Sequence, residues 1–228
     1  MKKMDIHSHT YYSGCGKDDP HLIVDAAIAG GVELFGISDH NYGIGERKNR
    51  YFEEMTAVKK EYAGKIQVLV GIEISVMPNL YDIKEGELKD FDYCLVELNA
   101  GGNIAEDNLV DFAKSWGIPT GIAHTDLFAF CKQKGFDTRD YFKMLADNGI
   151  FWEMNVNYDS IHKFREHQYV KDFFASSQQQ ELVKETGLMI SVGFDGHRVE
   201  DYLPERVVDA CRRLEEAGVK TVDEVLGK

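Results

Sequence analysis

Short apolar segments alternate with longer amphipathic segments along this chain, and this alternation restricts its fold more than any other feature. The apolar segments have the length of buried strands, and the longer ones have helical periodicity. The predicted strands span residues 4–7, 34–38, 67–72, 93–98, 120–123, 151–154 and 189–192. The predicted helices span residues 20–30, 46–63, 105–115, 138–148, 169–186 and 204–216. Strands that alternate with helices usually pair in parallel, so the pattern predicts an α/β fold.

A parallel sheet of this kind is either open or closed into a barrel. Open nucleotide-binding sheets carry Gly-x-Gly-x-x-Gly after the first strand or a Gly-Lys-Ser/Thr loop, and neither motif occurs here. The seven strands therefore favour a distorted β/α barrel resembling the TIM type. No linker or internal repeat divides the 228 residues, so we expect a single domain over residues 1–228.

The charge balance and the chain's early residues restrict partners and location. A net charge of -13 disfavours nucleic acids and anionic membranes, which attract clustered basic residues. No apolar run approaches the ~20 residues of a membrane helix, and His7 precedes any leader-like apolar core. The 4 cysteines contain no Cys-x-x-Cys pair. We expect a cytoplasmic protein with reduced thiols and neither a membrane nor a nucleic-acid partner.

Histidines and carboxylates follow nearly every predicted strand. The carboxyl ends of barrel strands meet on one face, so residues far apart in sequence become neighbours there. Residues i and i+2 of an extended segment project to the same side, and such pairs can hold one cation. The residues concerned are His7, His9, His40, Glu73, His124, Asp195 and His197. The pattern predicts a metal-dependent hydrolase, whereas His21, His162 and His167 are expected to be structural.

Five short motifs, in this order, resemble those of the PHP-domain family, the polymerase and histidinol phosphatase family. They are His7-Ser8-His9-Thr10, Ser38-Asp39-His40-Asn41, Gly71-Ile72-Glu73, Ala123-His124 and Asp195-Gly196-His197. The resemblance spans nearly the whole chain. It implies a distorted seven-stranded barrel that binds two or three metal ions, commonly zinc, manganese or iron, and hydrolyses phosphate esters.

The resemblance also implies a ligand set. One metal would have His7, His9, Glu73 and Asp195; a second would share Glu73 and add His124 and the residue ending strand four; a third would have His40, His197 and a residue after His9. Asn99 and Cys15 stand at the two positions where the family commonly has other ligands. An amide oxygen is a weak ligand, whereas a thiolate prefers zinc. We therefore expect zinc ahead of manganese or iron, and a loosely bound second metal.

The chemistry expected of this centre is hydrolysis of a small phosphate monoester, for which histidinol phosphate is one candidate. Metal ions lower the pKa of bound water and neutralise phosphoryl oxygens. Asp195 is expected to orient or deprotonate the attacking water. Arg198 and Arg165 are expected to bind the phosphate, and residues 155–169 to cover the site. The oligomeric state stays open.

Two alternatives remain. Amidohydrolases also begin with His-x-His and cleave C–N bonds, but their binuclear members bridge the metals with a modified lysine on strand four. Here Asn99 ends that strand and Glu73 is the expected bridge, which favours a phosphoesterase. The other alternative is a PHP domain that binds metal without catalysis, which Asn99 and Cys15 would suit.

Overall fold

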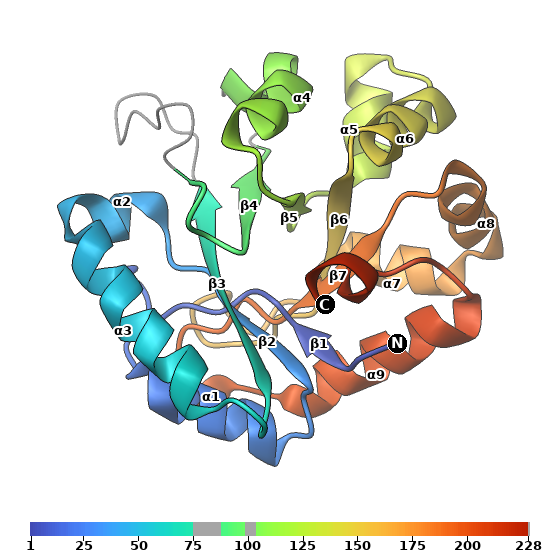
Figure 1. Ribbon diagram of the computed structural model, residues 1–228. Helices are drawn as coiled ribbons and strands as arrows, with labels where there is room; N and C mark the ends of the chain where they lie inside the picture. Colours follow the sequence, from blue (N-terminus) through green and yellow to red (C-terminus); the bar gives the residue numbers. More distant parts are fainter. Residues whose placement is uncertain (75–87, 99–103, 228) are drawn as a thin grey trace.

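The computed structural model describes residues 1–74, 88–98 and 104–227, without the side chains of 104–108. Its seven strands form one sheet in chain order, and each strand pairs in parallel with the next (Figure 1). The strands are β1 (Met4–Asp5), β2 (Leu34–Ile37), β3 (Gln67–Ile74), β4 (Tyr93–Glu97), β5 (Thr120–Ala123), β6 (Ile150–Asn155) and β7 (Ile190–Gly193). All seven predicted strands are present.

The first and last strands meet and nearly close the sheet. The backbone N–H of Ile6 donates to Val192 at 3.0 Å, and that of Asp195 donates to His7 at 2.7 Å. A single parallel bridge joins Ser8 to Gly196. Because β1 has only two residues, this seam is short and the barrel is distorted. The predicted fold class is confirmed.

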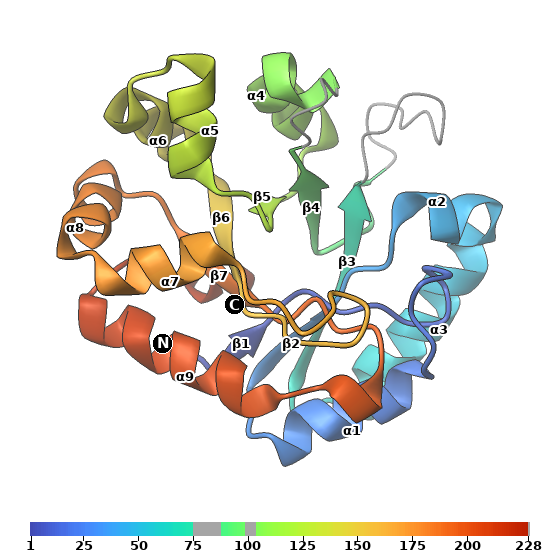
Figure 2. The same cartoon turned by 180° about the vertical axis from the view of Figure 1, so that it is seen from behind.

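The helices lie outside the strands (Figures 1 and 2). They are α1 (Pro20–Ala29), α2 (Asn41–Ile44), α3 (Lys48–Glu61), α4 (Ile104–Trp116), α5 (Leu127–Lys134), α6 (Thr138–Asp147), α7 (Gln168–Ala175), α8 (Ser177–Thr186), α9 (Pro204–Ala217) and α10 (Asp223–Leu226). Two short 3-10 helices, η1 (Gly45–Arg47) and η2 (Val199–Asp201), complete them. Within the described ranges, no helix combines the length and the apolar character needed to cross a bilayer.

The helix predicted over residues 169–186 is two helices. Ser176 between them has an extended backbone, with φ -112° and ψ 101°, and its side chain accepts a hydrogen bond from the N–H of Gln179. A serine in this position caps the second helix, so the break follows from local chemistry. Helix α5 was not predicted; it is capped at its start by Asp126 and ends before Gly135, where φ is 71°.

Tyr93 fills the barrel interior below the carboxyl ends of the strands. Its hydroxyl donates to the carbonyl of Ile6 at 2.6 Å, and its side chain is fully buried. Gly36 and Gly71 make room for the ring, because a Cβ atom on either would lie about 2 Å from Tyr93 atoms. The ring thereby ties β4 to the start of the His7 segment.

Candidate metal centre

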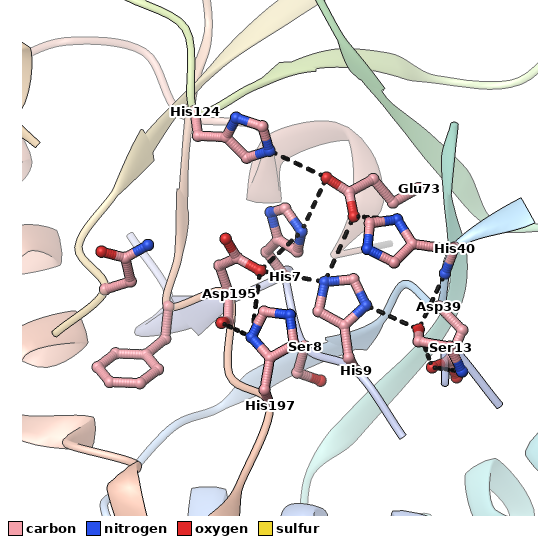
Figure 3. A network of polar contacts seen from close by, with 12 residues as sticks. His7, Ser8, His9, Ser13, Asp39, His40, Glu73, His124, Asp195 and His197 are labelled. Atoms are coloured by element: carbon pink, nitrogen blue, oxygen red, sulfur yellow. Dashed lines mark hydrogen bonds and ion pairs between the residues drawn. The ribbon is translucent and has the colours of Figure 1, made fainter. Parts of the chain in front are cut away.

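Seven of the predicted ligands converge at the carboxyl ends of the strands (Figure 3). They are His7, His9, His40, Glu73, His124, Asp195 and His197. Glu73, near the end of β3, lies among them. Its Oε1 is 3.1 Å from His124 Nε2, and its Oε2 is 2.9 Å from His40 Nδ1. The two oxygens of one carboxylate thus face histidines from different strands.

The pair His7 and His9 faces both Glu73 and Asp195. His9 Nε2 lies 3.0 Å from Asp195 Oδ1 and 3.3 Å from Glu73 Oε2. His7 Nε2 lies 3.4 Å and 3.3 Å from oxygens of the same two carboxylates. All four residues are buried. Two imidazoles and two carboxylates that face one another in this way form a typical set of ligands for a divalent cation.

Several of these buried atoms lack a hydrogen-bond partner among the described residues. They are His7 Nε2, His40 Nδ1 and Glu73 Oε2. His40 Nδ1 and Glu73 Oε2 are only 2.9 Å apart, yet their orientation does not form a hydrogen bond. Leaving a buried polar group unpaired costs about 1–3 kcal/mol. Cations held between these lone pairs would satisfy them, so the residues present fit a metal centre.

The pKa values of the histidines and carboxylates in this centre depend on one another. Burial favours the neutral form of Glu73, but the positive charge of His7 and the hydrogen bond from His124 hold its pKa well below the usual range. Asp195 behaves in the same way, with His7 and His9 as its main partners. Burial opposes protonation of His7, but the charges of Glu153 and Glu73 raise its pKa well above the usual value. Without cations, protonated imidazoles balance the carboxylates, so metal binding must release protons.

A second group of ligands gathers around His40 and His197. Nitrogen atoms of these two residues and of His9 lie within 4.8 Å of one another. The thiol of Cys15 contacts His197 and His40. Burial opposes ionisation of this thiol, but hydrogen bonds from His197 and His40 lower its pKa to about 5. The Cys15 thiol is thus near His40 and His197, and its role as a ligand stays a prediction.

Strand four carries a possible ligand, Glu97, that was not predicted from the sequence. Asn99 lies outside the described residues. The strand predicted over residues 93–98 ends at Glu97. Glu97 Oε1 lies 3.6 Å from His124 Nε2, and both group with Glu73 as possible ligands to one cation. The available signal was a glutamate closing an otherwise apolar strand.

Residues behind the histidines fix their orientation. Glu153 Oε1 lies 2.7 Å from His7 Nδ1. Asp39 accepts hydrogen bonds from the Ser13 hydroxyl at 2.5 Å and from the Thr10 N–H at 2.7 Å. The same Ser13 hydroxyl lies 2.9 Å from His9 Nδ1. Such outer partners select the tautomer that presents the other ring nitrogen to a metal. A charged residue inside the apolar sixth strand was the signal for Glu153.

The segment after β6 also reaches the centre, through His162. The buried carboxylate of Asp159 accepts from the N–H of His162 at 2.8 Å and lies 2.7 Å from its Nδ1. His162 Nε2 then lies 3.4 Å from Asp195 Oδ2. His167 stacks beside His124, with ring centroids 6.3 Å apart. The Asp-x-x-His spacing was the signal for the first of these contacts.

The remaining histidine and the two arginines lie outside this cluster of contacts. His21 pairs with Asp19 and Glu61 at the surface, in keeping with a structural role. Arg165 is exposed, and its side chain has no hydrogen bond or ion pair among the described residues. Arg198 is half-exposed and points Nη1 toward Glu200 at 3.4 Å, while its Nε is buried without a partner in the same part of the chain.

Two ligand candidates have unusual backbones. His124 has a φ of 25° and Asp195 a φ of 57°, a region that side chains other than glycine rarely adopt. Such conformations cost about 1–3 kcal/mol each and persist where the surroundings enforce them. The N–H of His124 donates to Glu153 Oε2 at 2.7 Å, and that of Asp195 to the carbonyl of His7 at 2.7 Å. These bonds hold the strained residues in place.

Known proteins support this picture at the level of family and fold. The family model described as "PHP domain" matches residues 5–185. Histidinol-phosphatase of Lactococcus lactis is 30% identical over 82 residues, which are 33% of this chain and 30% of that protein. The chain thus matches less than a third of the length of this curated relative.

Two solved structures have the same fold. One is histidinol phosphate phosphatase of Lactococcus lactis, complexed with zinc, L-histidinol and phosphate; its TM-score is 0.67 at 18% identity, with 96% of this chain and 95% of that chain covered. The other, from Listeria monocytogenes, is described as a histidinol phosphatase and has a TM-score of 0.53 at 16% identity, covering 87% and 96%. With a family model that matches most of its length, this chain belongs to the PHP domain family.

Proposed function

We propose that the protein is a metal-dependent phosphoesterase that hydrolyses a small phosphate monoester. The observation that carries the proposal is the position of Glu73, whose two oxygens face His124 and His40 while His7 and His9 approach from β1. One carboxylate can therefore bridge two cations. Cations a few ångström apart activate water, neutralise phosphoryl oxygens and stabilise the leaving oxygen.

The centre would hold two or three divalent ions, with zinc preferred and manganese or iron as alternatives. The proposed ligands are His7, His9, Cys15, His40, Glu73, Glu97, His124, Asp195 and His197. Asn99, predicted from the sequence, stays a prediction because it lies outside the described residues. The thiolate and the many imidazoles favour zinc.

Asp195 is the residue best placed to handle the proton of the attacking water. Its Oδ1 faces His9 at 3.0 Å, among the proposed ligands. Its Oδ2 faces His162 at 3.4 Å and Asn155 at 3.5 Å, toward the segment after β6. One oxygen can thus bind a cation while the other accepts a proton or orients the water.

Arg198 is the better placed of the two proposed phosphate-binding residues. It directly follows His197, and its buried Nε has a free hydrogen-bond donor among the described residues. A guanidinium donates to phosphate with two parallel N–H groups. Arg165, in the segment that also carries His162, would have to turn toward the centre to contact the same phosphate.

The candidate substrate with the strongest support is histidinol phosphate. Of the two solved structures described above, the one with the higher TM-score to this chain is complexed with zinc, L-histidinol and phosphate. Sugar phosphates and nucleotides have the same reacting group and remain in the proposal. We also propose a cytoplasmic location, because enzymes acting on such small phosphorylated metabolites work where these are made.

The amidohydrolase alternative has less support. Binuclear amidohydrolases use a modified lysine on strand four, but β4 here reads Tyr-Cys-Leu-Val-Glu. The proposed bridge is Glu73 on β3. The geometry therefore favours phosphate esters over amides.

The test is a phosphate-release assay after chelation and readdition of zinc or manganese. Substrates are histidinol phosphate, sugar phosphates and nucleotides on one side, and amides and lactams on the other. We expect metal-dependent phosphate release that His7→Ala abolishes and the surface control His21→Ala preserves. Amide cleavage without phosphate release would refute the proposal. Folded, metal-loaded protein inactive on both groups would indicate a non-catalytic PHP domain.

A further inference from the structure

Asp5, the last residue of β1, carries a fully buried carboxylate that is not among the proposed ligands. Its Oδ1 accepts hydrogen bonds from the backbone N–H of Phe194 at 2.9 Å and from that of His7 at 3.3 Å. Phe194 directly precedes Asp195, whose side chain faces His7 in the proposed metal centre (Figure 3). One oxygen of Asp5 thus joins the backbone that carries His7 to the backbone that carries Asp195.

Tyr202 orients this carboxylate. Its hydroxyl donates to Asp5 Oδ2 at 2.8 Å, and its ring packs edge-on against that of Phe194, with centroids 5.1 Å apart. A buried carboxylate is costly unless its oxygens have hydrogen-bond donors. Here Oδ1 has the two backbone N–H groups and Oδ2 has the phenol, so the side chain is held in one orientation.

The seam between β1 and β7 is short, so side-chain contacts across it have a large influence on its spacing. A parallel bridge joins Ser8 to Gly196. Gly193 lets β7 approach closely, because a Cβ there would lie 2.6 Å from His7 Cβ. His7 Nε2 and Asp195 Oδ1 are 3.4 Å apart. Ligand atoms must lie within about 0.2 Å of their preferred distances from a metal, so a small shift of either segment would weaken binding.

We propose that Asp5 is a positioning residue that sets the spacing between His7 and Asp195, and that Tyr202 holds its carboxylate in place. Asp5 acts through backbone N–H groups and does not bind the metal itself. The inference rests on the proposed function only in assuming that a cation binds between His7 and Asp195. It goes further because neither Asp5 nor Tyr202 belongs to the proposed ligands.

The test compares two substitutions of Asp5. Asp5→Ala leaves the two buried N–H groups without an acceptor. Asp5→Asn keeps one oxygen for them, and its amide can donate to the hydroxyl oxygen of Tyr202. Zinc affinity is measured by competition with a chromophoric chelator. We expect Asp5→Ala to bind zinc at least ~10-fold more weakly, as changes to residues that orient ligands do, and Asp5→Asn to recover most of that loss.

A second comparison separates positioning from stability. Val183, on α8, is fully buried, and this helix packs on α6 and α7. Val183→Ala creates a cavity and should lower the unfolding free energy of the chelated protein, as Asp5→Ala should. Urea denaturation measures both losses. Only Asp5→Ala is expected to weaken zinc binding and to change the visible spectrum of cobalt(II)-loaded protein, which reports on the arrangement of the ligands.

Tyr202→Phe extends the test to a milder change. It removes one hydrogen bond of the carboxylate and keeps the two backbone bonds, so zinc affinity should fall less than in Asp5→Ala. If Asp5→Ala does not fold, Tyr202→Phe takes its place in the comparison with Val183→Ala. Circular dichroism verifies the fold of each variant.

The positioning role is overturned if folded Asp5→Ala, or Tyr202→Phe in its place, binds zinc as tightly as the unaltered protein. Equal losses of affinity in Val183→Ala, or in Asp5→Asn and Asp5→Ala, would overturn it as well. Phosphate release on the same samples separates this inference from the proposed function. Zinc binding that depends on Asp5 in a protein without phosphate release would refute only the function. Phosphate release with zinc affinity independent of Asp5 would refute only the positioning role.

Discussion

Glu153 holds His7 from the side opposite the proposed cations. Its Oε1 lies 2.7 Å from His7 Nδ1, and the Nε2 of the same ring faces Glu73 and Asp195. The carboxylate accepts a hydrogen bond from the Nδ1–H group, and this leaves the Nε2 lone pair available to bind a metal. Glu153 Oε2 also accepts the N–H of His124, so one buried residue positions ligands from two strands.

Glu153→Gln should therefore weaken zinc binding. The amide removes the negative charge behind His7 and brings an N–H group toward the N–H of His124. Changes to such outer partners reduce metal affinity by about 10–100-fold. Zinc affinity is measured by competition with a chromophoric chelator, with Glu53→Gln as the control and circular dichroism to verify folding. Unchanged affinity in a folded variant would contradict the positioning role.

Zinc binding should strengthen as the pH rises. Burial lowers the pKa of His40, but its proximity to Cys15 and to the Glu73 carboxylate raises it to about 10, and Asp159 and Cys15 do the same for His197. Both imidazoles are thus protonated at neutral pH in the cation-free protein, and each proton that zinc displaces makes affinity rise about tenfold per pH unit up to that pKa. Calorimetry in buffers of different ionisation enthalpy measures the protons released. Binding without proton release at pH 7 would contradict this expectation.

Tyr93→Phe should destabilise the barrel without removing a ligand. The substitution leaves the buried carbonyl of Ile6 without its donor, which costs about 1–3 kcal/mol. Urea denaturation of the chelated protein measures the change in unfolding free energy. Tyr158→Phe, at an exposed position, serves as the control and should stay within about 0.5 kcal/mol of the unaltered protein. Equal effects of the two variants would show that the hydroxyl of Tyr93 adds nothing.

Arg198→Ala should impair substrate binding more than Arg165→Ala. Arg198 follows His197 directly and has a buried unpaired Nε in the described chain, whereas Arg165 is exposed. Loss of a charge-assisted hydrogen bond costs about 1.5–3 kcal/mol, which is roughly 10–100-fold in kcat/KM. Steady-state kinetics with the best phosphate ester measures both variants, and Arg212→Ala is the surface control. A larger loss in Arg165→Ala would mean that the segment after β6 turns inward to bind phosphate.

Much of the fold and of the ligand set could be predicted because both depend on local patterns. The strand at residues 120–123 was predicted to the residue, and the gathering of the strand-end histidines and carboxylates followed from the rule that parallel strands end on one face. Glu97 was missed because the strand was extended by one residue to Leu98, so that Glu97 was counted within the strand and Asn99 as the residue that follows it.

His162 could not be predicted in the same way, because its position depends on contacts distant in sequence. Ser160, in the same turn, is hydrogen-bonded to Asp201 of η2, and Asp159 reaches both His162 and His197. The pattern of apolar and polar residues in this segment does not indicate these partners. Loops that reach a site are placed by the rest of the fold rather than by their own sequence.

The seam between β1 and β7 determines when the centre can form. His7 and His9 precede Asp195 and His197 in the chain by nearly the whole length of the barrel, and the Ser8–Gly196 bridge joins the two segments. A growing chain thus has no complete binding set until nearly all strands have emerged. Cations held by this set would link the first and last strands, and because a ligand that binds only the folded chain stabilises it, they would strengthen the short β1–β7 seam.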